Sequence, residues 1–414
     1  MRQLLVSVAA LLLSIAVLLF GVGLMGTLLS VRLTFEGMHP QVKGVVLAAY
    51  YIGLVIGAHQ GGRIIRQAGH IRAFAIFAAL STAAILLQGL YVSAGSWIAL
   101  RVLIGFSMSG IFMVVESWLN ERSDPGSRGM VFSIYQIIFY GAIGAGQFLL
   151  YLGDPAGSEL FMVVAILFAL CLVPVALSQA STPPQPLENA PMALRQTWRD
   201  SHLAVVTCIG AGLLTGALMT LLPVAALRLE LSLELISWLM ASLIIGGVVL
   251  QWPIGHYSDR LGRRPMIIIV AGATMLVSVL LLFAIADLPF WAMTTLSALL
   301  GGLVFTLYPL SVSLANDALE EGNFVSVAAA LIFLWGIGAA TGPILGGWIL
   351  GMTPPGGLFG YVAVVSALLL MNALAMGRVL QAIRNPFRMM IRSSPVIAEM
   401  DPRVHGDDDE SDKA

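Results

Sequence analysis

Charged residues are scarce in this sequence. Asp, Glu, Lys and Arg make up 10% of its 414 residues, whereas a typical soluble domain carries about 25%. Apolar residues make up 58%, and the mean hydropathy is +0.93. A soluble globule cannot bury that much apolar surface, and a disordered chain needs low hydrophobicity and high charge. The composition therefore predicts an integral membrane protein.

Signs of several other protein classes are also missing. Lys and Arg number 21 against 22 Asp and Glu, so there is no basic excess that would bind nucleic acid. The two cysteines, Cys171 and Cys208, both fall in apolar runs, which favours small buried side chains over a disulfide or a metal site. No phosphate-binding loop, His-Glu-x-x-His string or Gly-x-Ser-x-Gly elbow occurs. We therefore expect neither an enzyme nor a metal or cofactor site.

Apolar runs long enough to cross a bilayer, which takes about 20 residues, recur along the chain. We predict twelve spans, at 4–31, 42–61, 72–93, 96–119, 129–152, 158–179, 202–227, 235–255, 265–286, 289–315, 324–350 and 357–379. The longest polar interruption separates six spans from six. The predicted fold is an all-α membrane protein with two pseudo-symmetric six-helix bundles. Its parts are an N-terminal bundle (1–179), a central linker (180–201), a C-terminal bundle (202–380) and a disordered tail (381–414).

Basic residues predict the orientation of the spans. One set of span ends carries most of them, namely Arg2, Arg63, Arg66, Arg72, Arg122, Arg128, Arg195, Arg199, Arg260, Arg263 and Arg264. The opposite set carries Arg32, Lys43 and Arg228. The first set is therefore expected in the cytoplasm, together with the linker, the tail and both termini of a protein in the inner membrane.

The two halves share a loop motif. Gly62 and Gly255 lie 193 positions apart, as do Gly69 and Gly262. Parallel repeats of six helices are a known transporter plan, with the site between the halves. The string from Gly255 to Pro265 resembles the loop motif of the major facilitator superfamily, whereas the first copy has Arg66 in place of the aspartate.

A narrower resemblance is to the YcaD-like group of bacterial facilitators. It rests on five features: Gly-His-Ile-Arg-Ala-Phe at 69–74, Val-Glu-Ser-Trp-Leu-Asn at 115–120, Arg128-Gly129 followed by Tyr135 and Tyr140, Gln-Trp-Pro-Ile-Gly at 251–255 and Phe-Thr-Leu-Tyr-Pro at 305–309. The resemblance to these families implies secondary transport of a small organic solute by alternating access, coupled to protons.

The second loop motif supplies candidate gate residues. Its glycines permit a tight turn, and its charges can pair with the next loop on the same side. We expect an ionic cluster that closes the cytoplasmic side of the C-terminal half; alternatively, the arginines only set the topology. The candidates are Gly255, Asp259, Arg260, Gly262, Arg263, Arg264 and Asp317.

Two charged residues inside the fourth span are proton-coupling candidates. Arg101, four residues before Gly105, resembles a span-4 motif of proton-coupled facilitators; the alternative is an arginine that snorkels to the outer surface. Glu116 also lies within the span, where a carboxyl group held away from water keeps its proton more readily; the alternative is an interfacial residue. Fifteen residues separate the two, or roughly 22 Å along a helix, so they cannot pair.

Few polar and aromatic residues are available to line a cavity, and they tend to point inward. The candidates are Tyr50, Tyr51, Tyr135, Gln136, Tyr140, Gln147, Gln251, Tyr308, Asn316 and Trp335. Some of the aromatic residues would alternatively form an interfacial belt. With no central pair of basic residues, the set favours a neutral or amphipathic solute.

Glycines four apart, Gly53 and Gly57 in one half and Gly338 and Gly342 in the other, predict close helix packing, which we expect at the boundary between the halves. The span-11 string resembles a Gly-Pro motif of antiporters, whereas span 5 has Gln147 where that motif has proline.

The sequence thus predicts a monomeric transporter of a small organic solute, with export slightly favoured over uptake. Its expected partners are protons, the solute and the lipid bilayer. A non-transporting membrane sensor or partner-binding protein is the alternative, favoured only by the acidic tail from Asp407.

Overall fold

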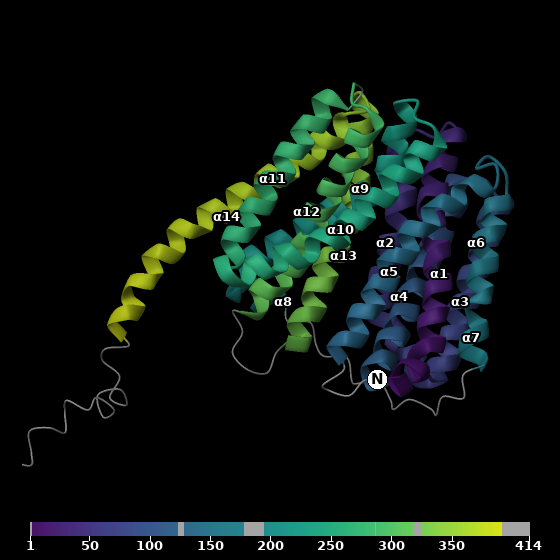
Figure 1. Ribbon diagram of the computed structural model, residues 1–414, viewed down its shortest axis with the longest axis horizontal. Coiled ribbons are helices and arrows are strands. Elements are labelled where there is room, and N and C mark those ends of the chain that lie inside the picture. The colour runs from purple at the N-terminus through teal and green to yellow at the C-terminus, as the bar shows by residue number, and fades with distance from the viewer. Residues whose placement is uncertain (1, 123–127, 178–193, 286, 318–323, 391–414) are drawn as a thin grey trace, which may run out of the picture.

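The computed structural model describes residues 2–122, 128–177, 194–285, 287–317 and 324–390, and in these residues every regular element is a helix (Figure 1). The N-terminal half contains α1 (Arg2–Phe35), α2 (Pro40–Ala68), α3 (His70–Leu90), α4 (Ala94–Arg122), α5 (Arg128–Gly146), the 3-10 helix η1 (Gln147–Leu152), α6 (Glu159–Leu170) and α7 (Leu172–Leu177). The C-terminal half contains α8 (Leu194–Asp200), α9 (His202–Arg228), α10 (Leu233–Leu261), α11 (Arg263–Ala284), α12 (Phe290–Asn316), α13 (Phe324–Met352) and α14 (Gly357–Met390).

Twelve segments of the described chain are long and apolar enough to cross a membrane, which confirms the all-α membrane fold predicted from the sequence. The fifth span joins α5 to η1, and the sixth joins α6 to α7. α14 continues past the bundle boundary predicted at 380 to Met390. Residues 178–193 of the linker region and 391–414 of the tail lie outside the described part of the chain.

Large apolar side chains cover the outer surface of the bundles. Ile76, Ile166, Val249, Leu276 and Leu368 are all exposed, although each belongs to a spanning helix. Exposure of this surface to water would be unfavourable, whereas contact with lipid tails is favourable.

The loop motif forms the same turn in both halves. Gly69, between α2 and α3, has φ +79° and ψ 162°, and Gly262, between α10 and α11, has φ +94° and ψ 151°. Only glycine populates this region without strain. Both helices before the turn therefore end at the glycine, and the chain reverses at once.

Glycines bring helices into backbone contact within each half. Gly53 and Gly57 of α2 pack on α4, where a Cβ on either residue would overlap the carbonyl oxygens of Val102 and Phe106. Gly338 and Gly342 pack on α9 in the same way. The expectation that these four glycines lie at the boundary between the halves is thus wrong, because the spacing predicts a close neighbour without specifying which helix it is.

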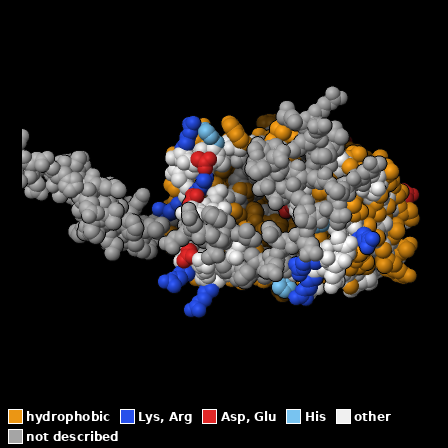
Figure 2. Space-filling model, turned by 90° about the horizontal axis from the view of Figure 1, so that it is seen from below, with side chains coloured by type: hydrophobic (Ala, Val, Ile, Leu, Met, Phe, Trp, Pro, Cys, Tyr) orange, Lys and Arg blue, Asp and Glu red, His pale blue; other side chains and the backbone are white. Residues whose placement is uncertain are grey.

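The two halves meet mainly through three pairs of spans. These are α2 with α13, α1 with α9, and the span made of α5 and η1 with α10. We call the side that holds the N-terminus the terminal side and the opposite side the far side (Figure 1). The halves touch at the far-side ends and middles of these helices, as with Gly44 against Pro343 and Ser30 against Thr220. Seen from the terminal side, a hollow opens between the halves, with apolar side chains on its walls and an acidic side chain within it (Figure 2). The fold thus positions a space that is open on one side and closed on the other.

Candidate functional site

Glu116 lies on α4 and is solvent-exposed although it belongs to a spanning helix. Its Oε1 accepts a long hydrogen bond of 3.4 Å from the hydroxyl of Tyr135 on α5, a side chain that is only 2% exposed. Tyr308, on α12 of the other half, lies close enough for the charge of Glu116 to act on its hydroxyl. The carboxyl group is therefore exposed, lies near Tyr308 of the other half and accepts a hydrogen bond from one buried hydroxyl.

Four aromatic side chains from both halves form a continuous series, which we call the aromatic row. The ring centroids of Tyr50 and Tyr51 lie 5.4 Å apart, those of Tyr51 and Trp335 6.2 Å apart, and those of Trp335 and Tyr308 6.0 Å apart. The first two contacts are edge-to-face, an arrangement that aromatic pairs favour. The row crosses from α2 to α13 and α12, so a rocking motion of the halves would break it.

Arg101 lies at the Tyr50 end of this row. Its guanidinium carbon is 4.5 Å from the centre of the Tyr50 ring, and the residue is only 5% exposed. Its Nε has no hydrogen-bond partner, and no carboxylate of the described residues lies within ion-pair distance. The side chain is therefore buried toward the protein interior and does not snorkel to the outer surface.

The remaining cavity candidates differ in their surroundings. Gln136 is exposed, and Tyr140, Gln251 and Asn316 are half-buried. Gln147 is only 2% exposed, and its amide nitrogen donates to the carbonyl oxygens of Gly23 at 3.0 Å and Ile143 at 3.3 Å. Its amide oxygen accepts from the Thr27 hydroxyl. Since α1 and α5 engage the whole amide group, Gln147 holds helices together and is not free for a solute.

The second loop motif carries an ionic cluster. Arg263 contacts Asp259 at 2.5 Å and Asp317 at 3.1 Å, and it donates to the Ser258 hydroxyl at 3.1 Å. Arg264 instead donates to the carbonyl oxygens of Ala373 and Leu374 on α14. Arg260 is exposed and Gly255 has open space around it. All partners belong to the C-terminal half, so the cluster ties the α10–α11 turn to the end of α12.

The first loop motif replaces this ion pair with a neutral contact. His70, at the position that Arg263 holds in the second half, lies 3.0 Å from the Ser117 hydroxyl through its Nε2. His70 is buried, and Arg66 is exposed. The turn is therefore fastened to α4 by a single hydrogen bond next to Glu116.

The far side is closed by backbone and polar contacts between the halves. Ser30 donates to the carbonyl oxygen of Thr220 at 2.8 Å, and the rings of Phe148 and Trp238 lie 4.8 Å apart. A Cβ on Gly347 of α13 would lie 2.7 Å from the carbonyl oxygen of Pro40 and 3.1 Å from Cα of Gly44. The helices therefore touch backbone to backbone here.

Two cations belong to this closure. Lys43 is only 4% exposed, and its Nζ donates to the hydroxyl of Thr34 at 3.0 Å. Arg228 is exposed, lies near Lys43 and donates to the carbonyl oxygens of Leu350 and Thr353 at the end of α13. Sequence reasoning used both residues for topology but missed the burial of Lys43 and the hydrogen bonds of the exposed Arg228 to the end of α13.

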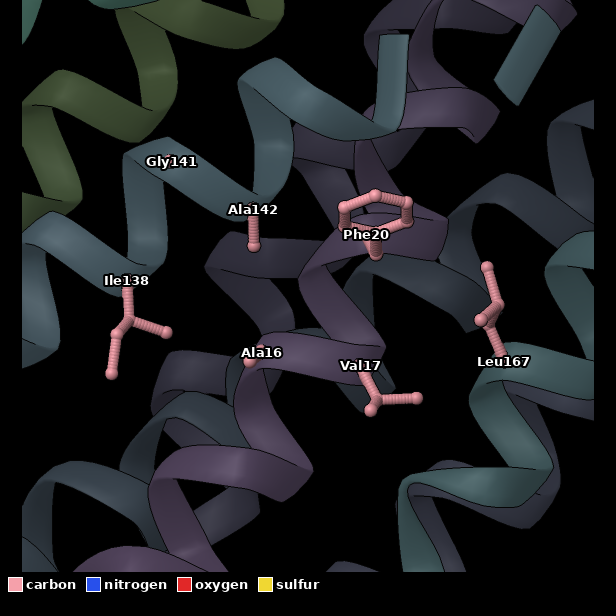
Figure 3. Close-up of a pocket in the computed structure, with 7 residues that line it drawn as sticks. All are labelled: Ala16, Val17, Phe20, Ile138, Gly141, Ala142 and Leu167. Carbon is pink, nitrogen blue, oxygen red and sulfur yellow. The ribbon is translucent and has the colours of Figure 1, made fainter. Parts of the chain in front are cut away.

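A separate apolar groove of about 480 Å³ lies between α1, α5 and α6. Its lining residues are Ala16, Val17, Phe20, Ile138, Gly141, Ala142 and Leu167 (Figure 3). All of them belong to one half and none carries a polar side chain. The groove therefore offers a solute no hydrogen bond from a side chain and is separate from the aromatic row.

The Major Facilitator Superfamily profile matches residues 11–235 and 205–387. The chain belongs to this superfamily. Relatives named as uncharacterized MFS-type transporters include YE1530 of Yersinia enterocolitica, 29% identical over 88% of this chain and 94% of its own length. YcaD of Escherichia fergusonii is 27% identical over 90% of this chain and 96% of its own length. These matches confirm the resemblance to the superfamily and its YcaD-like members.

Solved facilitator structures share the fold. The nucleoside transporter NupG superimposes with a TM-score of 0.75 at 14% identity, covering 89% of this chain and 98% of its own. A D-xylose-proton symporter gives 0.65 at 16% identity, covering 89% and 96%. The protein is thus a multi-pass facilitator with a small-molecule substrate, and it is not an enzyme.

Proposed function

We propose that this facilitator is a secondary active transporter that moves a small organic solute by alternating access, coupled to protons through Glu116. The observation that supports it best is the hollow between the halves, which is open on the terminal side (Figure 2). Contacts between the halves close its far side. A transporter of this plan rocks two rigid halves around a central site.

The terminal side is the cytoplasmic side in this proposal, and the described conformation is inward-facing. Basic residues support the assignment, since Arg63, Arg66 and Arg72 lie at the α2–α3 turn and Arg260 and Arg263 at the α10–α11 turn. Basic residues concentrate on the cytoplasmic side of inner-membrane proteins. Both termini then lie in the cytoplasm, and the working unit we propose is a monomer.

Glu116 is the proton-coupling group that we propose, because its side chain is exposed in the described conformation and lies near Tyr308 of the other half. When the terminal side closes, the hollow loses water and the neutral carboxyl becomes favoured. Protonation of Glu116 therefore favours closure of the terminal side, and closure favours protonation. Arg101 is too far along α4 to neutralise the carboxylate.

Export is the direction that we propose. The hollow opens toward the cytoplasm, and its apolar and aromatic walls suit an amphipathic solute that reaches it from the inner leaflet. The ionic cluster of Asp259, Arg263 and Asp317 keeps the α10–α11 turn rigid while the terminal side opens and closes.

The proposal is tested by measuring how pH changes the conformation. Spin labels at exposed Arg66 and Arg199 report the terminal side, and labels at His39 and Met352 report the far side. In lipid nanodiscs, we expect acidification to shorten the terminal-side distances and lengthen the far-side ones, and Glu116→Gln to abolish this response. Glu159→Gln, the same change at an exposed site on α6, should respond like the unchanged protein.

Two results would contradict the proposal. A pH response that survives in Glu116→Gln would exclude this residue as the coupling group. Distances that show one conformation under every condition would exclude alternating access and favour a non-transporting sensor.

A further inference from the structure

We infer that the solute is a monoanionic organic acid, whose acid group binds Arg101 and whose apolar or aromatic body stacks on the aromatic row. This inference rests on the proposed transport function, and it narrows the amphipathic solute expected from the sequence to one sign of charge.

Arg101 lacks the partner that a buried guanidinium normally has. It is permanently charged and has five N–H donors, yet its Nε has no hydrogen-bond partner and its guanidinium lies over the face of the Tyr50 ring. A cation–π contact is weaker than an ion pair with hydrogen bonds. The planar fork of a guanidinium matches a carboxylate with two parallel bonds. An acid group on the solute would supply what the described residues do not.

The route from the far side to Arg101 carries the same sign of charge. Lys43 is seven residues before Tyr50 on α2, about two helical turns, so the two residues share one face of the helix. Its Nζ bonds a neutral hydroxyl, and the neighbouring Arg228 bonds carbonyl oxygens. No ion pair of the described residues involves Lys43, Arg101 or Arg228. Such a route attracts an anion and repels a cation.

The carboxyl group of Glu116 does not oppose this assignment. It lies on the same helix, roughly 22 Å along the axis from Arg101, at the opposite end of the aromatic row. A solute body that covers Tyr50 and Tyr51 keeps its acid group near Arg101 and away from Glu116. One guanidinium at the row also explains why we assign one negative charge, since a second would have no partner there.

The test compares acids with uncharged analogues of the same shape. Thermal unfolding of the full-length protein in detergent is measured with benzoate and benzamide, phenylacetate and phenylacetamide, and octanoate and octanamide. A hydrogen-bonded charge pair predicts that at least one acid binds about tenfold to a hundredfold more tightly than its amide. Phenyltrimethylammonium should not bind.

Variants then locate the acid group. Arg101→Gln should abolish the preference for the acid, and Arg101→Lys should keep part of it. Arg63→Gln, the same change at an exposed arginine, should keep all of it. Even where an Arg101 variant fails to fold, the comparison of acids with amides on the unchanged protein still tests whether the site prefers a negative charge.

Three results would overturn the inference: equal binding of acids and amides, preference for the cation, or no stabilisation by any acid. None of them bears on alternating access, which the spin-label distances test separately. Conversely, an acid preference that depends on Arg101 in a protein whose halves never exchange would support the site and contradict transport.

Discussion

Replacement of Gly347 by alanine should open the far side of the transporter. The new Cβ would lie 2.7 Å from the carbonyl oxygen of Pro40 and 3.1 Å from Cα of Gly44, and real Cβ atoms essentially never come within 3.0 Å of another heavy atom. Both partners are backbone atoms of the other half, so they cannot swing away as a side chain would. The overlap is removed only when α2 and α13 move apart.

The size of the effect follows from the cost of overpacking, which is typically about 1–3 kcal/mol. This strain acts on the inward-facing state alone, because the two helices separate in the outward-facing state. The ratio of outward-facing to inward-facing protein should therefore rise about fivefold to 150-fold. The better helix propensity of alanine, about 1 kcal/mol, acts on both states and cancels.

Distances between spin labels at His39 and Met352, in lipid nanodiscs, measure this ratio. The native thiols of Cys171 and Cys208 are buried, so labelling is confined to introduced cysteines. Gly44→Ala changes the same contact from the other half and should shift the distances in the same direction. Gly26→Ala is the control, since a Cβ there meets nothing within 4 Å. Far-side distances in Gly347→Ala and Gly44→Ala that superimpose on those of the control would refute the assignment of the closure to this contact.

Two further predictions concern the stability of the halves. Gly262→Ala should lower the free energy of unfolding by about 1–3 kcal/mol, because φ +94° and ψ 151° lie in a region that only glycine adopts freely. Thermal melting in detergent measures the loss, with Gly255→Ala as the control. Equal melting temperatures of the two variants would contradict the prediction. Gln147→Leu should lower the free energy of unfolding by about 1–3 kcal/mol, because it removes the amide group that bonds the buried Thr27 hydroxyl and the Gly23 carbonyl oxygen. Thr27→Val in the same chain should recover part of the loss, and strictly additive losses would show that the two side chains are not coupled.

The turns and the span count were predictable because they depend on local sequence. The spacing of Gly69 and Gly262 in the repeat predicted two tight turns, and both glycines have the same unusual backbone angles. The proximity of Arg263 to Asp317 was also foreseeable, since opposite charges flank loops on one side of the membrane. The structure brings these two side chains within 3.1 Å.

Contacts between helices could not be predicted from the same patterns. Gln147 looked like a cavity residue because polar groups inside spans tend to point inward, yet the backbone of α1 satisfies its amide. A lysine near the end of a span, such as Lys43, is typical of the interface with water. Tertiary packing nevertheless leaves Lys43 only 4% exposed, with its Nζ bonded to Thr34 of α1. Gly347 belongs to the Gly-rich string of span 11, but neither this string nor the lone Gly44 shows from sequence that the two glycines meet, because their contact exists only between the halves.

The positions of Arg101, Lys43 and Arg228 also fit the energetics of moving an acid outward. In the proposed orientation, an inside-negative membrane potential drives a monoanion toward the far side by about 2.3 kcal/mol per 100 mV. The main opposing term is the loss of hydration when the acid enters the membrane. Arg101 offsets that loss at the row, and Lys43 and Arg228 offset it at the closure. When the far side opens, water also reaches the buried Lys43 and Arg101 and competes for the acid. The contacts that attract the acid within the membrane therefore weaken at the point of release.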